Sequence, residues 1–246
     1  MPRTDLILCL SLLTTVVCLS ACSSPPRSHI AQNGAPLDSA TNAYRAYEAG
    51  DCAAVDARFD DADLEDWPPN EARSSFLLLA SFCAEQKNDI PRAHETYRQL
   101  LRESPLSFAA DDARDRLRIL RLRENDPEYD DWVAAAKTRA HQGSTDRAPI
   151  ERTPASYPPL AQIAQIGGYA VVEFGVTPRG DTDAPVVVDS EPPLLFDGVA
   201  VRAIREWRYA ADADGTQSER QAIRLVFKPE NAATPDLDVL GETSTN

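Results

Sequence analysis

The sequence predicts an α+β protein in which an α-helical N-terminal region precedes a small three-stranded antiparallel sheet with helices on one face. Apolar residues from 38 to 143 recur at helical spacing, and no segment there alternates convincingly as a strand does. After the polar linker 144–153 the period changes to two, with one amphipathic helix at 196–207. The expected strands are 169–177, 185–190 and 220–228. A chain of 246 residues therefore suits two modest modules plus non-globular ends.

The charge and the motifs argue against several classes of function. The chain has 25 Lys plus Arg against 39 Asp plus Glu, a net charge of −14, and such a surface repels nucleic acid. Asp181-x-Asp183 and Asp212-x-Asp214 do not continue into a calcium-binding loop, and no phosphate loop or serine elbow is present. The three histidines, His29, His94 and His141, show no metal-ligand spacing. We therefore expect no enzyme, catalytic residue, metal, cofactor or nucleic-acid partner.

Residues 1–21 have the character of an export signal. Their apolar stretch, 6–21, is slightly shorter than the ~17–25 residues that span a bilayer. It ends in the motif Leu19-Ser20-Ala21-Cys22. This motif resembles the lipobox of bacterial lipoproteins, which implies that Cys22 carries lipid. Because Ser23 rather than Asp follows, the resemblance implies the outer membrane of a Gram-negative bacterium, facing the periplasm. The alternative is an ordinary signal peptide with an incidental cysteine.

The segment 22–37 contains prolines and a glycine among polar residues, and we expect it to be a flexible tether between the membrane and the folded part. Two further cysteines, Cys52 and Cys83, remain in the mature chain. An even number in an oxidising compartment suggests one disulfide, with two buried reduced thiols as the alternative.

Ala93, Tyr97 and Pro105 are spaced like the second helix and closing proline of one helical repeat, and Gly50 stands at the equivalent turn of the unit before it. The region 38–143 thus resembles tetratricopeptide repeats. The large aromatic and glycine positions of that family's first helices are missing. A generic pair of helical hairpins is the alternative.

Stacked helices of this kind bring the start of one unit's second helix beside the end of the next unit's first helix. Cys52 and Cys83 occupy these two places, and they can bridge if their α-carbons approach to ~4.4–6.8 Å. Beyond the repeats, a last helix is expected between Asp126 and Gly143, covering the apolar edge that terminal repeats leave open.

The C-terminal residues 154–230 carry the most specific pattern. It comprises Tyr157-Pro158, Gly168, Val172-x-Phe174-x-Val176, Gly180, Val188-x-Ser190, Phe196-Asp197 and Ala203-x-x-x-Trp207-Arg208-Tyr209. Together these residues resemble the TonB C-terminal domain. Ala210-Ala211 departs from the family, which often has a proline there.

A sheet this small leaves an edge that can accept an extended peptide as an added strand. In the TonB family the third-strand edge binds a short segment of outer-membrane transporters. The resemblance therefore implies a partner-binding edge at Arg220, Gln221, Ala222, Ile223, Arg224, Leu225, Val226 and Phe227. Alternatively, these residues only complete the sheet or pair in a homodimer. The polar tail 231–246 lies over that edge or is disordered.

These features favour a lipid-anchored periplasmic adaptor, whose helical repeats hold one protein and whose terminal domain holds another by strand addition. The partners are envelope proteins such as outer-membrane transporters, and the lipid at Cys22 supplies the membrane contact. Two alternatives stay open. One is a TonB-type energy transducer for outer-membrane transport that retains its N-terminal helix. The other is an envelope-organising protein that binds peptidoglycan.

Overall fold

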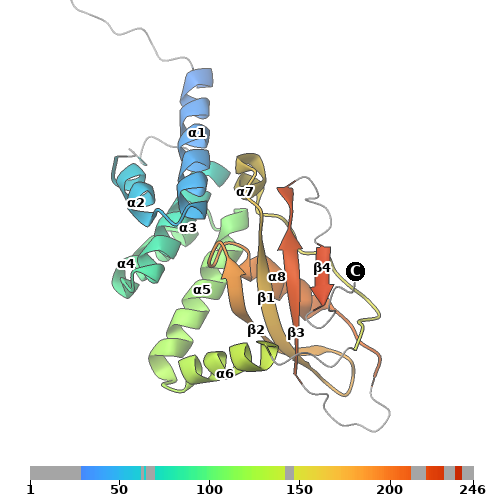
Figure 1. Ribbon diagram of the computed structural model, residues 1–246. Coiled ribbons are helices and arrows are strands. Elements are labelled where there is room, and N and C mark those ends of the chain that lie inside the picture. Colours follow the sequence, from blue (N-terminus) through green and yellow to red (C-terminus); the bar gives the residue numbers. More distant parts are fainter. Residues whose placement is uncertain are drawn as a thin grey trace, which may run out of the picture.

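The computed structural model describes residues 29–61, 64, 70–141, 147–211, 220–229 and 236–239 (Figure 1). The export signal 1–21, the lipidation candidate Cys22 and the first part of the expected tether lie outside these residues. Helices make up the N-terminal region, and the strands with two further helices make up the C-terminal region, which confirms the α+β class.

The helical region consists of consecutive helices that pack against one another. They are α1 His29–Glu48, α2 Cys52–Asp61, α3 Glu71–Gln86, α4 Ile90–Glu103, α5 Phe108–Asn125 and α6 Tyr129–His141. Asn70 and Asp89 cap α3 and α4 by accepting hydrogen bonds from the backbone N–H groups of Arg73 and Arg92. Gly50 lies in the left-handed region at φ 72°, where glycine fits without a steric penalty, and this permits the sharp turn between α1 and α2.

The first helix is longer than expected. It begins at His29, so Gly34 and Pro36, which suggested a tether over 22–37, lie inside it. The C-terminal half of α1 is held by burial of Ala43, Tyr44 and Tyr47. Because helix propagation from a formed segment is favourable, the turns before this half extend the helix despite the glycine and proline.

The helical region packs around α3, whose Phe76, Leu77, Leu79 and Phe82 are fully buried. The disulfide expected between Cys52 and Cys83 is present, with an α-carbon separation of 5.4 Å. It joins the first residue of α2 to the last turn of α3, as the stacking of helical hairpins predicts.

The C-terminal region is built on one sheet. Its elements are α7 Pro159–Ala164, β1 Gly168–Val176, β2 Thr182–Glu191, α8 Asp197–Glu206, β3 Gln221–Phe227 and β4 Asp236–Val239. Within the described residues the order is β2-β1-β3-β4, and every neighbouring pair is antiparallel. The three predicted strands and the helix between the second and third are all found, and β4 adds a fourth strand from the tail.

The two faces of the sheet are covered by different helices. On one face α8 covers a core that includes Phe174, Phe196, Trp207 and Phe227. On the other face lies α6, which was expected to close the helical repeats and instead packs against the strands (Figure 1). The contact is made by small side chains, and its buried members are Ala136, Ala140, Val171, Val186, Val188 and Ala222. Small residues on α6 allow this helix to approach the sheet closely.

The helical and sheet regions share one continuous core, so residues 38–143 are not packed independently of residues 154–230. Tyr47 of α1 donates a hydrogen bond from its hydroxyl to the carbonyl of Pro193 at 2.6 Å. Arg202 of α8 lies 2.8 Å from Asp112 of α5. A Cβ atom at Gly198 would collide with the carboxylate of Asp112, so glycine leaves room for this carboxylate where α5 approaches α8.

Candidate functional site

The predicted partner-binding edge lies inside the sheet. β3 pairs with β1 on one side and with β4 on the other, so the segment 220–227 is not a free edge. The outer side of β3 is filled by residues 236–239 of the same chain, with Ile223 opposite Val239 and Val226 opposite Asp236. The prediction of an open edge is therefore corrected.

The physical reason for this correction is the set of unpaired backbone groups along β3. An edge strand presents N–H and C=O groups that bind any extended segment within reach. The eight residues between Phe227 and Asp236 are enough for the chain to turn back. The sequence carried a short signal for this strand, because Leu237 and Val239 alternate with two aspartates.

The side chains of β3 divide between the two faces of the sheet. Ile223, Leu225 and Phe227 are buried in the core beneath α7 and α8. On the opposite face Arg220, the residue before β3, places its Nε 2.6 Å from the carboxylate of Glu173, and the guanidinium of Arg224 stacks 3.8 Å from the ring centre of Tyr169. Both arginines thus contact residues of β1. β3 pairs with β4 through its backbone N–H and C=O groups.

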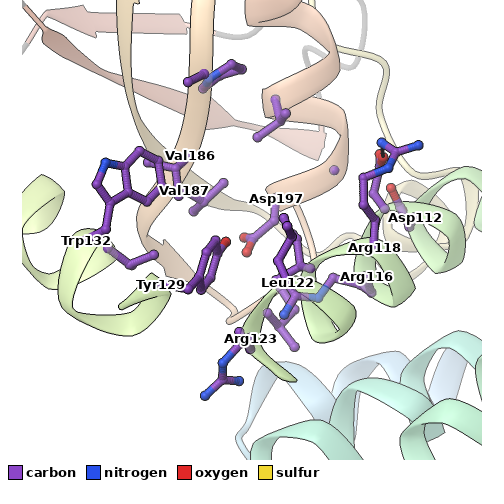
Figure 2. Close-up of a pocket in the computed structure, with 18 of the residues that line it drawn as sticks. Asp112, Arg116, Arg118, Leu122, Arg123, Tyr129, Trp132, Val186, Val187 and Asp197 are labelled. Carbon is purple, nitrogen blue, oxygen red and sulfur yellow. Dashed lines mark hydrogen bonds and ion pairs between the residues drawn. The ribbon is translucent and has the colours of Figure 1, made fainter. Parts of the chain in front are cut away.

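A second candidate site, which sequence reasoning missed, is a pocket of about 440 Å³ where α5 and α6 meet β2 and the start of α8 (Figure 2). Its apolar lining comprises Phe82, Ile119, Leu122, Trp132, Val133, Pro185, Val186, Val187, Leu194 and Val201. The elements that form it are far apart in sequence, so no local pattern indicated a pocket. Tyr129 and Trp132, whose rings lie 6.1 Å apart, are close in the sequence, but two neighbouring aromatic residues do not by themselves indicate a pocket.

Asp197, the first residue of α8, directs its carboxylate into this pocket (Figure 2). The residue is 8% exposed, and its Oδ1 atom has no hydrogen-bond partner among the described residues. The hydroxyl of Ser190 bonds the carboxylate. Burial raises the pKa of Asp197 above its usual range, because charge is costly where water is excluded. The pocket therefore contains a buried acceptor whose hydrogen-bonding capacity is only partly used.

The other charged groups that line the pocket are paired. The closest pairs are Arg116–Glu85 (Nε to Oε2, 3.2 Å), Arg123–Asp130 (2.9 Å), Arg202–Asp112 (2.8 Å), Arg202–Asp115 (3.1 Å) and Arg118–Asp115 (3.2 Å). Arg205 lies 4.0 Å from Asp115. In the described part of the chain, Asp197 is thus the charged lining residue without an ion pair.

The weaker sequence signals do not converge. His94 faces Glu124 at 3.4 Å, and Asp181 pairs with Arg208 at 3.3 Å. The described residues hold no group of three or more His, Cys, Asp or Glu arranged for a metal ion. None of the described helices is both long and apolar enough to cross a bilayer.

Comparison with known proteins gives a match for the C-terminal region. Residues 153–229 match the family described as Gram-negative bacterial TonB protein C-terminal. Protein TonB of Klebsiella pneumoniae is 37% identical over 84 residues, covering 34% of each chain. Protein TonB of Pseudomonas aeruginosa is 32% identical over 84 residues, which are 34% of this chain and 25% of that protein. The match thus spans about a third or less of these relatives.

A solved structure, titled as a molecular characterization of the TonB2 protein from Vibrio anguillarum, is 28% identical. It covers 35% of this chain and 85% of that chain, with a TM-score of 0.29.

Proposed function

Because residues 153–229 belong to the TonB C-terminal domain family, we propose that this chain is a lipid-anchored adaptor of the Gram-negative envelope. Its terminal domain recruits another protein by strand addition to β3, and its helical region holds a second protein. The protein has no catalytic role. Cys22 places it in the outer membrane, facing the periplasm.

The observation that carries this proposal is the pairing of β3 with β4. Residues 236–239 use the outer side of β3 as an extended partner strand would, in antiparallel register over four positions. Backbone pairing of this kind is the basis of recognition by strand addition. We propose that a partner strand takes the place of β4, whose four residues form a short and therefore weakly held strand.

The tail itself provides a probe for this exchange. A chain that ends at Pro229 is expected to bind a synthetic peptide of residues 231–246 in trans, whereas the full chain is expected to bind it at least tenfold more weakly. Circular dichroism checks that the shortened chain remains folded. Equal binding to both chains, or none to the shortened chain, contradicts displacement at β3.

Two modified peptides distinguish strand addition from side-chain contact. One carries N-methyl groups at positions 236 and 238, and the other at 237 and 239. Alternate N–H groups of a strand point in opposite directions, so one peptide should lose binding and the other should retain it. Loss of binding by both peptides, or by neither, would argue against a backbone ladder.

The anchor has a separate test. Palmitate labelling of cells that express the chain should mark the protein, and Cys22→Ala should abolish the label. A protein that keeps its N-terminal methionine in the membrane fraction would instead support an energy transducer.

A further inference from the structure

We propose that the pocket between α5, α6, β2 and the start of α8 is a recognition site for a basic side chain, lysine or arginine. This side chain is presented by a partner polypeptide that lies beside β2. This inference goes beyond the proposed function, since it uses neither the outer side of β3 nor Cys22. It is carried by the carboxylate of Asp197, which is buried, directed into the pocket and incompletely bonded (Figure 2).

The chemistry of the ligand follows from Asp197. A buried polar atom without a partner is costly, and a ligand that donates a hydrogen bond to Oδ1 removes that cost. A cationic donor gives a charge-assisted bond, which is roughly twice as strong as a neutral one. Arg116 does not supply this donor, because its guanidinium is bonded to Glu85.

The pocket walls fit the stem of such a side chain. Leu122, Val187 and Val201 provide apolar surface around the carboxylate. Trp132 is 36% exposed and Leu122 is 46% exposed, so the entrance presents apolar groups to solvent. Lysine and arginine bury their methylene stems along such surfaces.

The position of the pocket favours a polypeptide over a free amine. Four successive residues of β2, from Ala184 to Val187, line it. In the sheet formed by the described residues, β2 is the terminal strand and pairs only with β1. A segment lying beside β2 would therefore contact residues that line the pocket of Asp197. The chain's net charge of −14 also attracts a basic partner over longer range.

The test compares two acetylated and amidated peptides, Gly-Val-Lys-Val-Gly and its norleucine counterpart, which has the same stem without the ammonium group. Binding to the full chain is followed by the NMR signal of the Trp132 indole N–H. The lysine peptide is expected to bind at least tenfold more tightly than the norleucine peptide. n-Butylamine alone is expected to bind at least tenfold more weakly than the lysine peptide.

Three variants test the role of the pocket. Asp197→Asn should reduce the lysine preference to less than twofold. Asp131→Asn, which removes an exposed acid of α6 outside the pocket lining, should leave the preference intact. Trp132→Ala, at a partly exposed position, should weaken both peptides, with binding then followed by calorimetry.

Four outcomes would overturn the proposal. The first is equal binding of the two peptides to the unmodified chain, and the second is an unchanged Trp132 signal with both. The third is a lysine preference that survives Asp197→Asn or falls equally with Asp131→Asn. The fourth is n-butylamine binding as tightly as the lysine peptide, which would indicate a site for a free amine. Each readout is independent of the β3 exchange experiment, so the two proposals fail separately.

Discussion

The two faces of the sheet are held by different kinds of contact. Beneath α8, large aromatic side chains pack directly, and the rings of Phe196 and Phe227 stack with centroids 4.3 Å apart. Beneath α6 the packed side chains are alanines and valines, and they surround a charged group. Glu173 is 1% exposed there and lies between Arg139 at 2.9 Å and Arg220 at 2.6 Å.

The aromatic contacts beneath α8 stabilise the C-terminal domain, whereas the contacts beneath α6 attach this domain to the helical region. The large aromatic residues of the α8 face, Phe174, Phe196, Trp207 and Phe227, all lie within the region matched by the TonB C-terminal family. The α6 face joins that region to a helix outside the match. In this contact α6 approaches the strands closely and buries only small side chains, and an ion cluster adds to the attachment. The stability of such a contact depends on geometry more than on buried area. Substitutions on the two faces should therefore differ in their cost to stability.

The largest effect is expected from Phe196→Ala on the α8 face. The substitution removes a fully buried ring and should lower the free energy of unfolding by about 3–5 kcal/mol. On the α6 face, Val188→Ala should cost about 1–2 kcal/mol, since it removes only two carbons. Urea unfolding of both variants measures the contrast, and similar losses would contradict it.

The disulfide belongs to neither face. Its removal by Cys52→Ala with Cys83→Ala should lower the free energy of unfolding by about 3–4 kcal/mol, because the bond closes a long loop in the unfolded chain. Hydrogen exchange should increase mainly in α2 and α3. Thiol counting on the denatured protein should find neither Cys52 nor Cys83 free. Faster exchange in β1 instead would indicate that the bond also supports the sheet.

Asp112 links the two regions and should make their attachment sensitive to pH. Burial raises the pKa of Asp112 from 3.8 to about 6, although Arg202 beside it works in the opposite direction. The folded state therefore holds this proton more tightly than the unfolded state, so the contribution to stability falls as pH rises from about 4 to 6.

Relative to Asp112→Asn, the unmodified protein should lose about 2 kcal/mol between pH 4 and pH 7, because each tenfold change in proton affinity is worth about 1.4 kcal/mol. The variant lacks the titrating carboxyl group. It also loses the bond from Asp112 to Arg202, which changes its free energy of unfolding by the same amount at every pH. Thermal unfolding across this range measures the difference. A flat difference would show that Asp112 titrates normally in the folded protein.

A smaller loss than that of Phe196→Ala is also expected from Glu173→Gln on the α6 face. The change leaves Arg139 and Arg220 without their anion, but their side chains are 39% and 21% exposed and can turn toward water. We expect a loss of about 1–3 kcal/mol, with faster hydrogen exchange in α6. The exposed control Glu206→Gln should stay within about 0.5 kcal/mol. A larger loss than that of Phe196→Ala would reverse the ranking of the two faces.

Local periodicity in the sequence was enough to locate most elements. The helical spacing of Phe76, Leu79 and Phe82 predicted α3, and the alternation through Val172 and Phe174 predicted β1. Spacing of this kind reports which side of an element is buried, and each element carries that information within about ten residues. The disulfide was also predictable, since helical stacking and an even cysteine count both indicated it.

Local periodicity did not predict which segment covers each exposed strand edge or sheet face. Local patterns predicted the α+β order, most helices and three strands, and they favoured the pairing of Cys52 with Cys83. That residues 236–239 occupy the outer side of β3, that α6 lies on the sheet, and that Asp197 enters a pocket became clear only from the three-dimensional fold. The reason is that these contacts join segments far apart in the chain, and the free energy of such contacts depends on shape and distance in three dimensions.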